Sequence, residues 1–174
     1  MIPQKDQNTR YYRLIVRRFK ENFASYVLDI YYDSYIEIYR VKSREDVQKI
    51  ELEMYGASYP YLSEDNLINT WKAGILEIYI GVLDNIITAF ASIIPWSKNK
   101  VYIDEFHVRK EFRGRGIGKL FLKKLENVLS RKHINKIVLD AHINSVGFFK
   151  KMGYRESEKT YGNYVRLYKV LNHL

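Results

Sequence analysis

The sequence predicts a mixed α/β fold in a single domain, on three observations. Segments of helical periodicity alternate along the chain with short segments of strand periodicity. A length of 174 residues and a hydrophobic fraction of 47% suffice for one packed core. The absence of cysteine excludes disulfide scaffolds, zinc–thiolate sites, iron–sulfur clusters and cysteine nucleophiles, and we expect no metal site.

Residues 1–34 are expected to form an extension of this domain. From Thr9 to Ala24, apolar side chains share one helical face and basic side chains share another, which predicts a basic amphipathic helix. Tyr26–Tyr32 is predicted to form a strand. The helix could serve as a surface for nucleic acid, an anionic membrane or a protein partner, or it could dock on the domain through its apolar face.

The main domain, residues 35–174, is expected to begin with a strand and two helices. Tyr35–Val41 alternates with period two, which predicts the strand. Ser43 has an acidic residue three positions later, which predicts the N-cap of a helix that ends near Tyr55. Ser63 is expected to cap a second helix, Glu64–Ala73.

Three strands, and then alternating helices and strands, complete the predicted order. Leu76–Leu83 and Ile86–Pro95 flank an Asp84-Asn85 turn that is typical of a hairpin. Val101–Val108 is the third strand. The remaining elements are helix Gly116–Lys132, strand Lys136–Asp140, helix Ser145–Met152, and strands Tyr154–Ser157 and Tyr164–Leu171.

The net charge of +9 is unevenly distributed. The net charge is +2 for residues 1–34, −4 for residues 35–108 and +11 for residues 109–174. An acidic middle predicts a cationic ligand and a basic carboxy-terminal third predicts a polyanion. Lysines spread unevenly over a solvated surface would give the same distribution.

No segment predicts membrane insertion or secretion. The longest charge-free stretch, Asn85–Ser97, has thirteen residues, whereas a spanning helix needs roughly 20. The amino terminus lacks the apolar region of a secretory signal. We therefore expect a cytoplasmic protein with no membrane partner.

A glycine-rich loop joins the predicted strand Val101–Val108 to the helix that follows it. Glycine stands at alternate positions, so the backbone can approach a ligand closely. Exposed N–H groups at the start of a helix suit a pyrophosphate. The spacing matches neither a P-loop nor a dinucleotide-binding motif. The glycines and cations of the loop are Arg113, Gly114, Arg115, Gly116, Gly118 and Lys119.

Two motifs carry a resemblance to a known family. Arg113-x-x-Gly116-x-Gly118, with the downstream segment from Asn144 to Tyr154, resembles the acetyl-CoA-binding core of the GCN5-related N-acetyltransferase (GNAT) family. The resemblance covers residues 35–171. It implies a mostly antiparallel mixed sheet of about six to seven strands, splayed at the fourth strand and flanked by about four helices.

The resemblance also implies acetyl-CoA as the cosubstrate. In the family, amides of the glycine loop grip the pyrophosphate of coenzyme A, and the preceding strand splays to admit the pantetheine arm. The residues implied in cofactor binding are Phe106, Val108, Arg113, Gly114, Arg115, Gly116, Ile117, Gly118, Lys119, Asn144 and Phe149.

The strand Tyr102–Val108 most resembles that of polyamine and other small-amine acetyltransferases. An amine must lose a proton before it attacks a thioester, so a carboxylate is the expected base. In the family the base lies on the strand face that corresponds to Tyr102 and Asp104, so we expect Asp104 to be the base. Glu105 and Tyr102 are expected to recognise the cationic acceptor. Strand alternation predicts that Asp104, Phe106 and Val108 share one face and that His107 lies on the other, away from the site. A strand N–H near Val108 is expected to meet the oxyanion.

One position departs from the family pattern. Phe149 stands where many members carry a tyrosine that protonates the departing thiolate. Tyr154, Tyr161 and Tyr164 are the candidate replacements, and we take Tyr154 as the catalytic one. Water could also supply the proton, or catalysis could be impaired.

These observations predict an N-acetyltransferase that transfers the acetyl group of acetyl-CoA to a primary amine, either a small polyamine-like molecule or a protein amine. The alternative is a basic protein that uses the same fold without catalysis, to bind nucleic acid or a partner. The positive charge surrounds the loop expected to hold the phosphates of coenzyme A, which argues against nucleic acid. A homodimer is left open.

Overall fold

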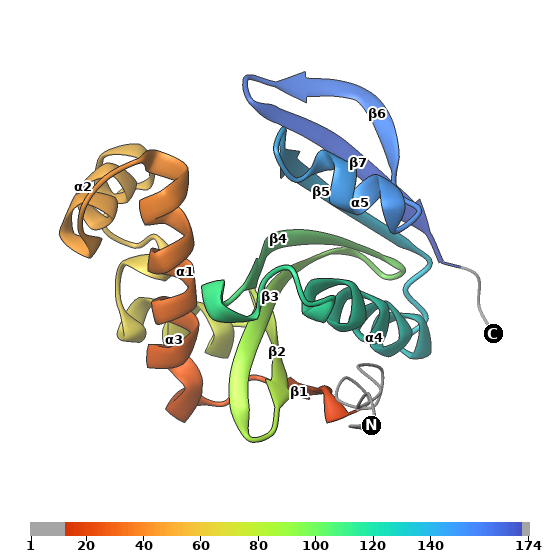
Figure 1. Cartoon of the computed structure of the whole chain (residues 1–174), viewed down its shortest axis with the longest axis horizontal. Helices are drawn as coiled ribbons and strands as arrows, with labels where there is room; N and C mark the ends of the chain where they lie inside the picture. Colours follow the sequence, from red (N-terminus) through yellow and green to blue (C-terminus); the bar gives the residue numbers. More distant parts are fainter. Residues whose placement is uncertain (1–12, 172–174) are drawn as a thin grey trace, which may run out of the picture.

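The computed structural model describes residues 13–171, without the side chains of residues 158–161 (Figure 1). One seven-stranded sheet with the order β1-β2-β3-β4-β5-β7-β6 runs through the described chain. Its strands are β1 (Ile15–Arg18), β2 (Glu77–Leu83), β3 (Ile86–Ser97), β4 (Lys100–Val108), β5 (Lys136–His142), β6 (Arg155–Tyr161) and β7 (Tyr164–Val170). The mixed α/β prediction is confirmed.

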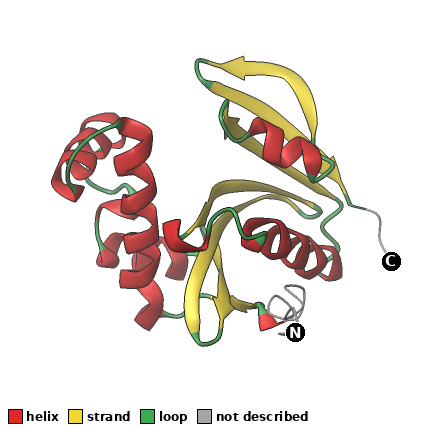
Figure 2. Ribbon diagram, viewed as in Figure 1, coloured by secondary structure: helices red, strands yellow, loops and turns green. Residues whose placement is uncertain are grey.

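Helices cover both faces of the sheet (Figure 2). The α-helices are α1 (Ala24–Tyr39), α2 (Arg44–Tyr55), α3 (Glu64–Lys72), α4 (Ile117–Arg131) and α5 (Val146–Lys151). The short 3-10 helices are η2 (Glu21–Phe23), η3 (Pro60–Leu62) and η4 (Lys110–Phe112). The last four α-helices match the predicted ones, including the N-caps: Ser43 forms a capping box with Asp46, and the side chain of Ser63 accepts a hydrogen bond from Asn66 N.

The sheet splays at its fourth strand, as the family resemblance implies. All neighbouring pairs are antiparallel except β4 and β5, which are parallel. That pairing spans only Lys100–Ile103 of β4. Beyond Ile103, β4 continues along β3 and β5 continues along β7. The two central strands therefore diverge, and one edge of β4 is left without a strand partner.

The helix predicted for Thr9–Ala24 is wrong over residues 14–20, whereas its end, residues 21–24, is helical. Its first four residues lie outside the described chain. Ile15–Arg18 is a strand that pairs antiparallel with β2. Leu14 is fully buried in the core under α4, while Ile15 is half exposed. The same apolar residues fit a helical face, but pairing with the open edge of β2 decides the conformation.

The two strands predicted for Tyr26–Tyr32 and Tyr35–Val41 are also wrong. Tyr26–Tyr32 and Tyr35–Tyr39 belong to α1, which ends where Arg40 adopts a left-handed conformation with φ 57°. The β-branched and aromatic residues of this segment favour strands, but spacings of three and four put its large side chains on one buried face. That face consists of Ala24, Val27, Leu28, Ile30, Tyr31, Tyr32 and Ser34.

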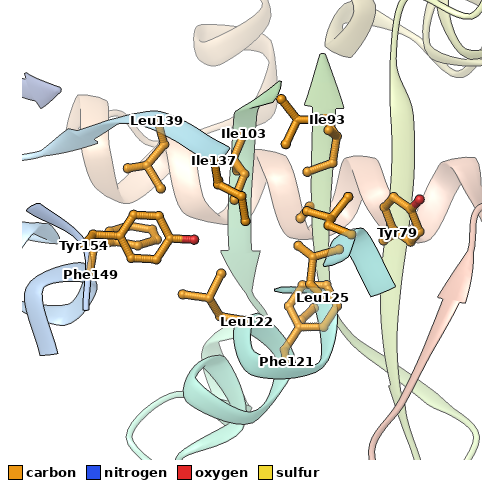
Figure 3. Close-up of a cluster of buried hydrophobic side chains, with 14 of the residues drawn as sticks. Tyr79, Ile93, Ile103, Phe121, Leu122, Leu125, Ile137, Leu139, Phe149 and Tyr154 are labelled. Carbon is orange, nitrogen blue, oxygen red and sulfur yellow. The ribbon is translucent and has the colours of Figure 1, made fainter. Parts of the chain in front are cut away.

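Two hydrophobic cores hold the layers together, one on each face of the sheet. In the first, Phe121, Leu122 and Leu125 of α4 point toward Ile137 and the neighbouring strands (Figure 3). The second core packs α1 and α3 against β2 and β3. No helix of the described chain is long and apolar enough to cross a bilayer.

Candidate active site

A cavity of about 710 Å³ opens where β4 and β5 diverge. Its walls come from α1, the half of β4 that does not pair with β5, the glycine loop, the end of β5, α5 and Tyr164 of β7. It therefore lies between α1 and the strands β5 and β7, at the N-terminus of α4 (Figure 1). The cavity brings together most of the predicted site residues: Asp104, Glu105, Phe106, Val108, Arg113, Gly114, Gly116, Gly118, Lys119, Asn144 and Phe149.

Three residues predicted to bind the cofactor or the acceptor do not belong to the described lining. Ile117 is 1% exposed and packs in the core beneath α4. Arg115 is exposed to solvent. The Tyr102 hydroxyl donates a hydrogen bond to Asp140 Oδ2 at 3.1 Å. Tyr102 thus joins β4 to β5 below the splay.

The glycine loop has the backbone geometry that an anion site needs. Gly114 and Gly116 have φ angles of +71° and +78°, and a Cβ at either position would meet no atom within 4 Å. Gly116 is the N-cap of α4, and no side chain caps that helix. The first amides of α4 therefore have no side-chain partner in the described structure, and they carry the positive end of the helix dipole.

Arg113 lines the cavity, but its guanidinium is engaged by neighbouring elements. Its Nε donates to the Val108 carbonyl at 2.8 Å, and its Nη2 donates to Ser34 Oγ at 3.2 Å. Its Nη1 lies 2.6 Å from Glu37 Oε2. These contacts anchor the loop to α1 and to the end of β4. Lys119, which also lines the cavity, forms no ion pair within the described chain.

A bulge in β4 changes the predicted faces of the strand. Glu105 pairs with Ser92 whereas Ile103 pairs with Ile93, so Asp104 is an extra residue opposite β3. Simple alternation therefore fails at Asp104. Phe106 and Val108 pack with Ile103 against the core under α4.

The bulge brings both carboxylates to the α1 side of β4. Asp104 contacts Tyr61 of η3, and Glu105 contacts Tyr35 of α1. His107 lies 2.5 Å from Glu105 Oε2 through its Nε2, and it lines the cavity. The predictions that Asp104 shares a face with Phe106 and that His107 lies away from the site are therefore wrong.

Asp104 is a mostly buried carboxylate. Its Oδ2 accepts from the Tyr61 hydroxyl at 3.3 Å and from Ser92 Oγ at 3.4 Å. Burial raises the pKa of Asp104 to about 7, and the negative charge of Glu105 adds to the shift. At neutral pH such a group is present in both protonation states, which suits a general base.

Glu105 is 8% exposed and is held by two partners. Its Oε1 accepts from the Tyr35 hydroxyl at 2.8 Å, and its Oε2 contacts His107. Within the described chain, neither Glu105 nor Asp104 has an ion pair with lysine or arginine. Apart from His107, the described site therefore has no basic side chain against these two carboxylates, and it offers negative charge to a cation.

Tyrosines from α1 and from the α2–η3 region surround these carboxylates, and the sequence analysis missed their role. Tyr31 stacks on Tyr61 with ring centroids 4.4 Å apart. Tyr31 and Tyr39 also donate to Glu51 Oε1, and Glu51 is 1% exposed. Burial raises the pKa of Glu51. The available signal was the high tyrosine content, 16 residues, with many of them in residues 31–61.

The tyrosines that are candidates for protonating the departing thiolate lie in different places. Tyr154 is 3% exposed, lies in the core and is not among the described residues that line the cavity. Burial, together with nearby Glu126, holds its pKa well above the usual value. Tyr164 lines the cavity, and burial together with Glu105 and Glu51 raises its pKa. The Tyr161 side chain lies outside the described residues. The structure thus brings Tyr164, and not Tyr154, to the site.

Comparisons with known proteins agree with this architecture. A family model described as an acetyltransferase (GNAT) domain matches residues 60–167. An uncharacterized N-acetyltransferase of Methanocaldococcus jannaschii is 29% identical over 120 residues, 66% of this chain and 74% of the relative. Another, of Chlorobaculum tepidum, is 50% identical over 54 residues, 31% of this chain, so the match spans only about a third (34%) of that relative's length.

A solved structure supports the fold independently. The PaiA N-acetyltransferase of Thermoplasma acidophilum, determined in complex with coenzyme A, superposes with a TM-score of 0.73 at 20% identity. The superposition covers 91% of this chain and 99% of that one. The family match covers more than half of the chain and includes the bulge in β4, the glycine loop and the splay. The chain therefore belongs to the GNAT family of acetyl-CoA-dependent N-acetyltransferases.

Proposed function

We propose that this protein transfers the acetyl group of acetyl-CoA to a primary amine by direct attack, with Asp104 as the general base. One observation carries the proposal: two buried carboxylates, Asp104 and Glu105, lie without a lysine or arginine partner in the cavity at the splay. The glycine loop opens into the same cavity. A cationic acceptor and an anionic cosubstrate thus have adjacent sites of opposite charge.

The cosubstrate is expected to follow the divergence of β4 and β5. The uncapped amides at the start of α4 would receive the pyrophosphate, and Lys119 would add positive charge. Beyond Ile103 the edge of β4 has no strand partner, so its free amides can hydrogen-bond the pantetheine arm. One of them, near Val108, would stabilise the oxyanion.

The acceptor enters as an ammonium ion, because an alkyl amine has a pKa of about 10. Glu105 attracts the cation, and the carboxylate of Asp104 takes one proton from it. The neutral nitrogen then attacks the thioester carbonyl. A nitrogen–carbon bond forms, the carbon–sulfur bond breaks and coenzyme A leaves as a thiolate. A second proton, lost from nitrogen, is released to solvent.

The thiolate needs a proton, and Phe149 has none to give. Tyr164 is the phenol we assign to this step, because it is the one of the described candidate side chains that lines the cavity. Water supplies the same proton if Tyr164 is removed, so its loss slows this step without abolishing it.

A thiol-release assay over a panel of acceptors tests the proposal. The panel contains a diamine, a polyamine, lysine, a peptide with a free amino terminus, and an amino-terminally acetylated peptide that lacks lysine as control. We expect release with at least one amine and background release with the control. Calorimetry establishes acetyl-CoA binding separately. Tight binding without release above background for any amine would refute catalysis, and a gel shift with nucleic acid would support the binding alternative.

A further inference from the structure

We propose that Ser92 and Tyr61 are positioning residues that hold Asp104 in its catalytic orientation by clamping the bulge in β4. Neither residue belongs to the described lining of the cavity, so both would act through the carboxylate. The inference rests on the proposed role of Asp104, and it explains how two adjacent strand residues come to lie on the same side of the sheet.

The bulge creates a hydrogen-bonding problem that Ser92 solves. An extra residue in one strand disrupts the ladder and leaves a backbone amide without its usual partner. That amide belongs to Glu105, and it donates to Ser92 Oγ at 3.1 Å. Ser92 is fully buried, so no water can replace the serine as a partner.

Tyr61 completes the clamp from the helical layer. It is 1% exposed, and its hydroxyl lies 2.5 Å from Ser92 Oγ and 3.3 Å from Asp104 Oδ2. Stacking against Tyr31, with an interplanar angle of 7°, fixes the ring. The position of the hydroxyl is thus set by η3 and α1, independently of β4.

The three contacts use the full capacity of one hydroxyl. Ser92 Oγ accepts from Glu105 N and from the Tyr61 hydroxyl, and it donates its own hydrogen to Asp104 Oδ2, 3.4 Å away. The single hydrogen of the Tyr61 hydroxyl is shared between Ser92 Oγ and Asp104 Oδ2. Alanine at position 92 would break all three contacts. Phenylalanine at position 61 would remove one hydroxyl and keep the stacked ring.

The clamp also sets the protonation of Asp104. Hydrogen bonds from Tyr61 and Ser92 favour the ionised carboxylate and oppose the effect of burial. The other titratable groups that interact with Asp104 come from β4 itself, from α2 and from the segment before η3. They are Glu105, Tyr102, Tyr55 and Tyr59.

The test compares Tyr61→Phe and Ser92→Ala with the parent by two readouts. Carbon-13 NMR follows the titration of the Asp104 carboxyl in the free protein, and the pH profile of kcat/KM follows catalysis. Both variants should move the Asp104 titration and the acid limb of kcat/KM upward by about half to one pH unit. The KM for acetyl-CoA should stay near the parental value.

Tyr79→Phe is the matched control. Tyr79 is also 1% exposed, and its hydroxyl also donates to a carboxylate, Glu77, but that pair lies outside the cavity. This control should leave both readouts unchanged. If Ser92→Ala fails to fold, the isosteric Tyr61→Phe still carries the test.

An unchanged Asp104 titration in Tyr61→Phe would overturn the clamp, even if melting temperature or activity fell. The NMR readout needs no turnover. A parent protein that acetylates no amine would therefore refute the proposed function while the titration still decides the inference.

Discussion

The Nη1 atom of Arg113 lies 2.6 Å from Oε2 of Glu37, and this ion pair ties the glycine loop to α1. Lys110 contacts the same glutamate at 2.9 Å. Lys110 and Arg113 together hold the pKa of Glu37 below its usual value. Arg113 therefore orders the loop, and the uncapped amides of α4 remain as the expected contacts for the pyrophosphate.

Arg113→Gln should lower the free energy of unfolding by about 1–2 kcal/mol, because two partly exposed hydrogen bonds and one partly exposed ion pair are lost. Acetyl-CoA should bind more weakly, but the dependence of log Kd on log salt should keep its parental slope. Urea unfolding and calorimetry at several salt concentrations measure these effects. A shallower slope with parental stability would instead identify Arg113 as a direct phosphate ligand.

Gly116→Glu should abolish measurable acetyl-CoA binding. The variant puts a side chain and a negative charge into the open space above the first amides of α4. Gly74→Glu is the matched control, since Gly74 has a φ of +72° and open space around its Cβ position, outside the cavity. The control should suffer the same backbone strain and bind acetyl-CoA normally. Parental binding by Gly116→Glu would remove the loop from the cofactor site.

Asp104→Asn should stabilise the protein at high pH. The pKa of Asp104 is about 7 in the folded protein and near 3.8 when unfolded, so the folded state binds more protons between these values. The parent protein therefore loses stability as pH rises from about 4 to about 7, because folding then requires an unfavourably buried charge at Asp104. The variant has no charge at this position, so its stability does not fall for this reason. We expect the variant to be more stable by about 1–3 kcal/mol at pH 8, allowing for partial exposure of the carboxyl, with no difference near pH 4.

Urea unfolding between pH 4 and pH 8 measures that difference. A constant offset between parent and variant across this range would show that Asp104 does not titrate with a raised pKa.

Tyr164→Phe should lower kcat by roughly 10²-fold if its hydroxyl protonates the thiolate. Tyr168→Phe, on the same strand but outside the described lining, is the control and should keep the parental kcat. Steady-state kinetics with saturating acetyl-CoA compare the two. Equal rates for both variants would assign the proton to water.

The sequence predicted the elements from Ser43 onward because caps, turns and periodicity agree there with the tertiary fold. It failed from Leu14 to Val41, where local propensity and tertiary packing disagree. Ile15 lies in a strand because β2 offers an open edge, and Tyr31 lies in a helix because its face is buried. In both cases the elements that pack against the segment lie far from it in the sequence.

The candidate site was predicted where short motifs carry it, as in the glycine loop. The parts of the site that depend on contacts between residues far apart in the sequence were not predicted. Tyr61 and Ser92 contact Asp104 across 43 and 12 residues of sequence, and no local pattern reveals these contacts. The bulge at Asp104 shifts the strand by one residue, and such a shift reverses the faces of the later residues relative to those before the bulge.

The pH profile of kcat/KM for Asp104→Asn tests the central claim most directly. If Asp104 deprotonates the acceptor, the variant should bind acetyl-CoA as the parent does while kcat/KM falls roughly 10²–10⁴-fold at neutral pH. The parental acid limb near pH 7 should disappear, and the loss should shrink as pH approaches the pKa of the amine. Parental kcat/KM at pH 7, with the acid limb intact, would contradict the account.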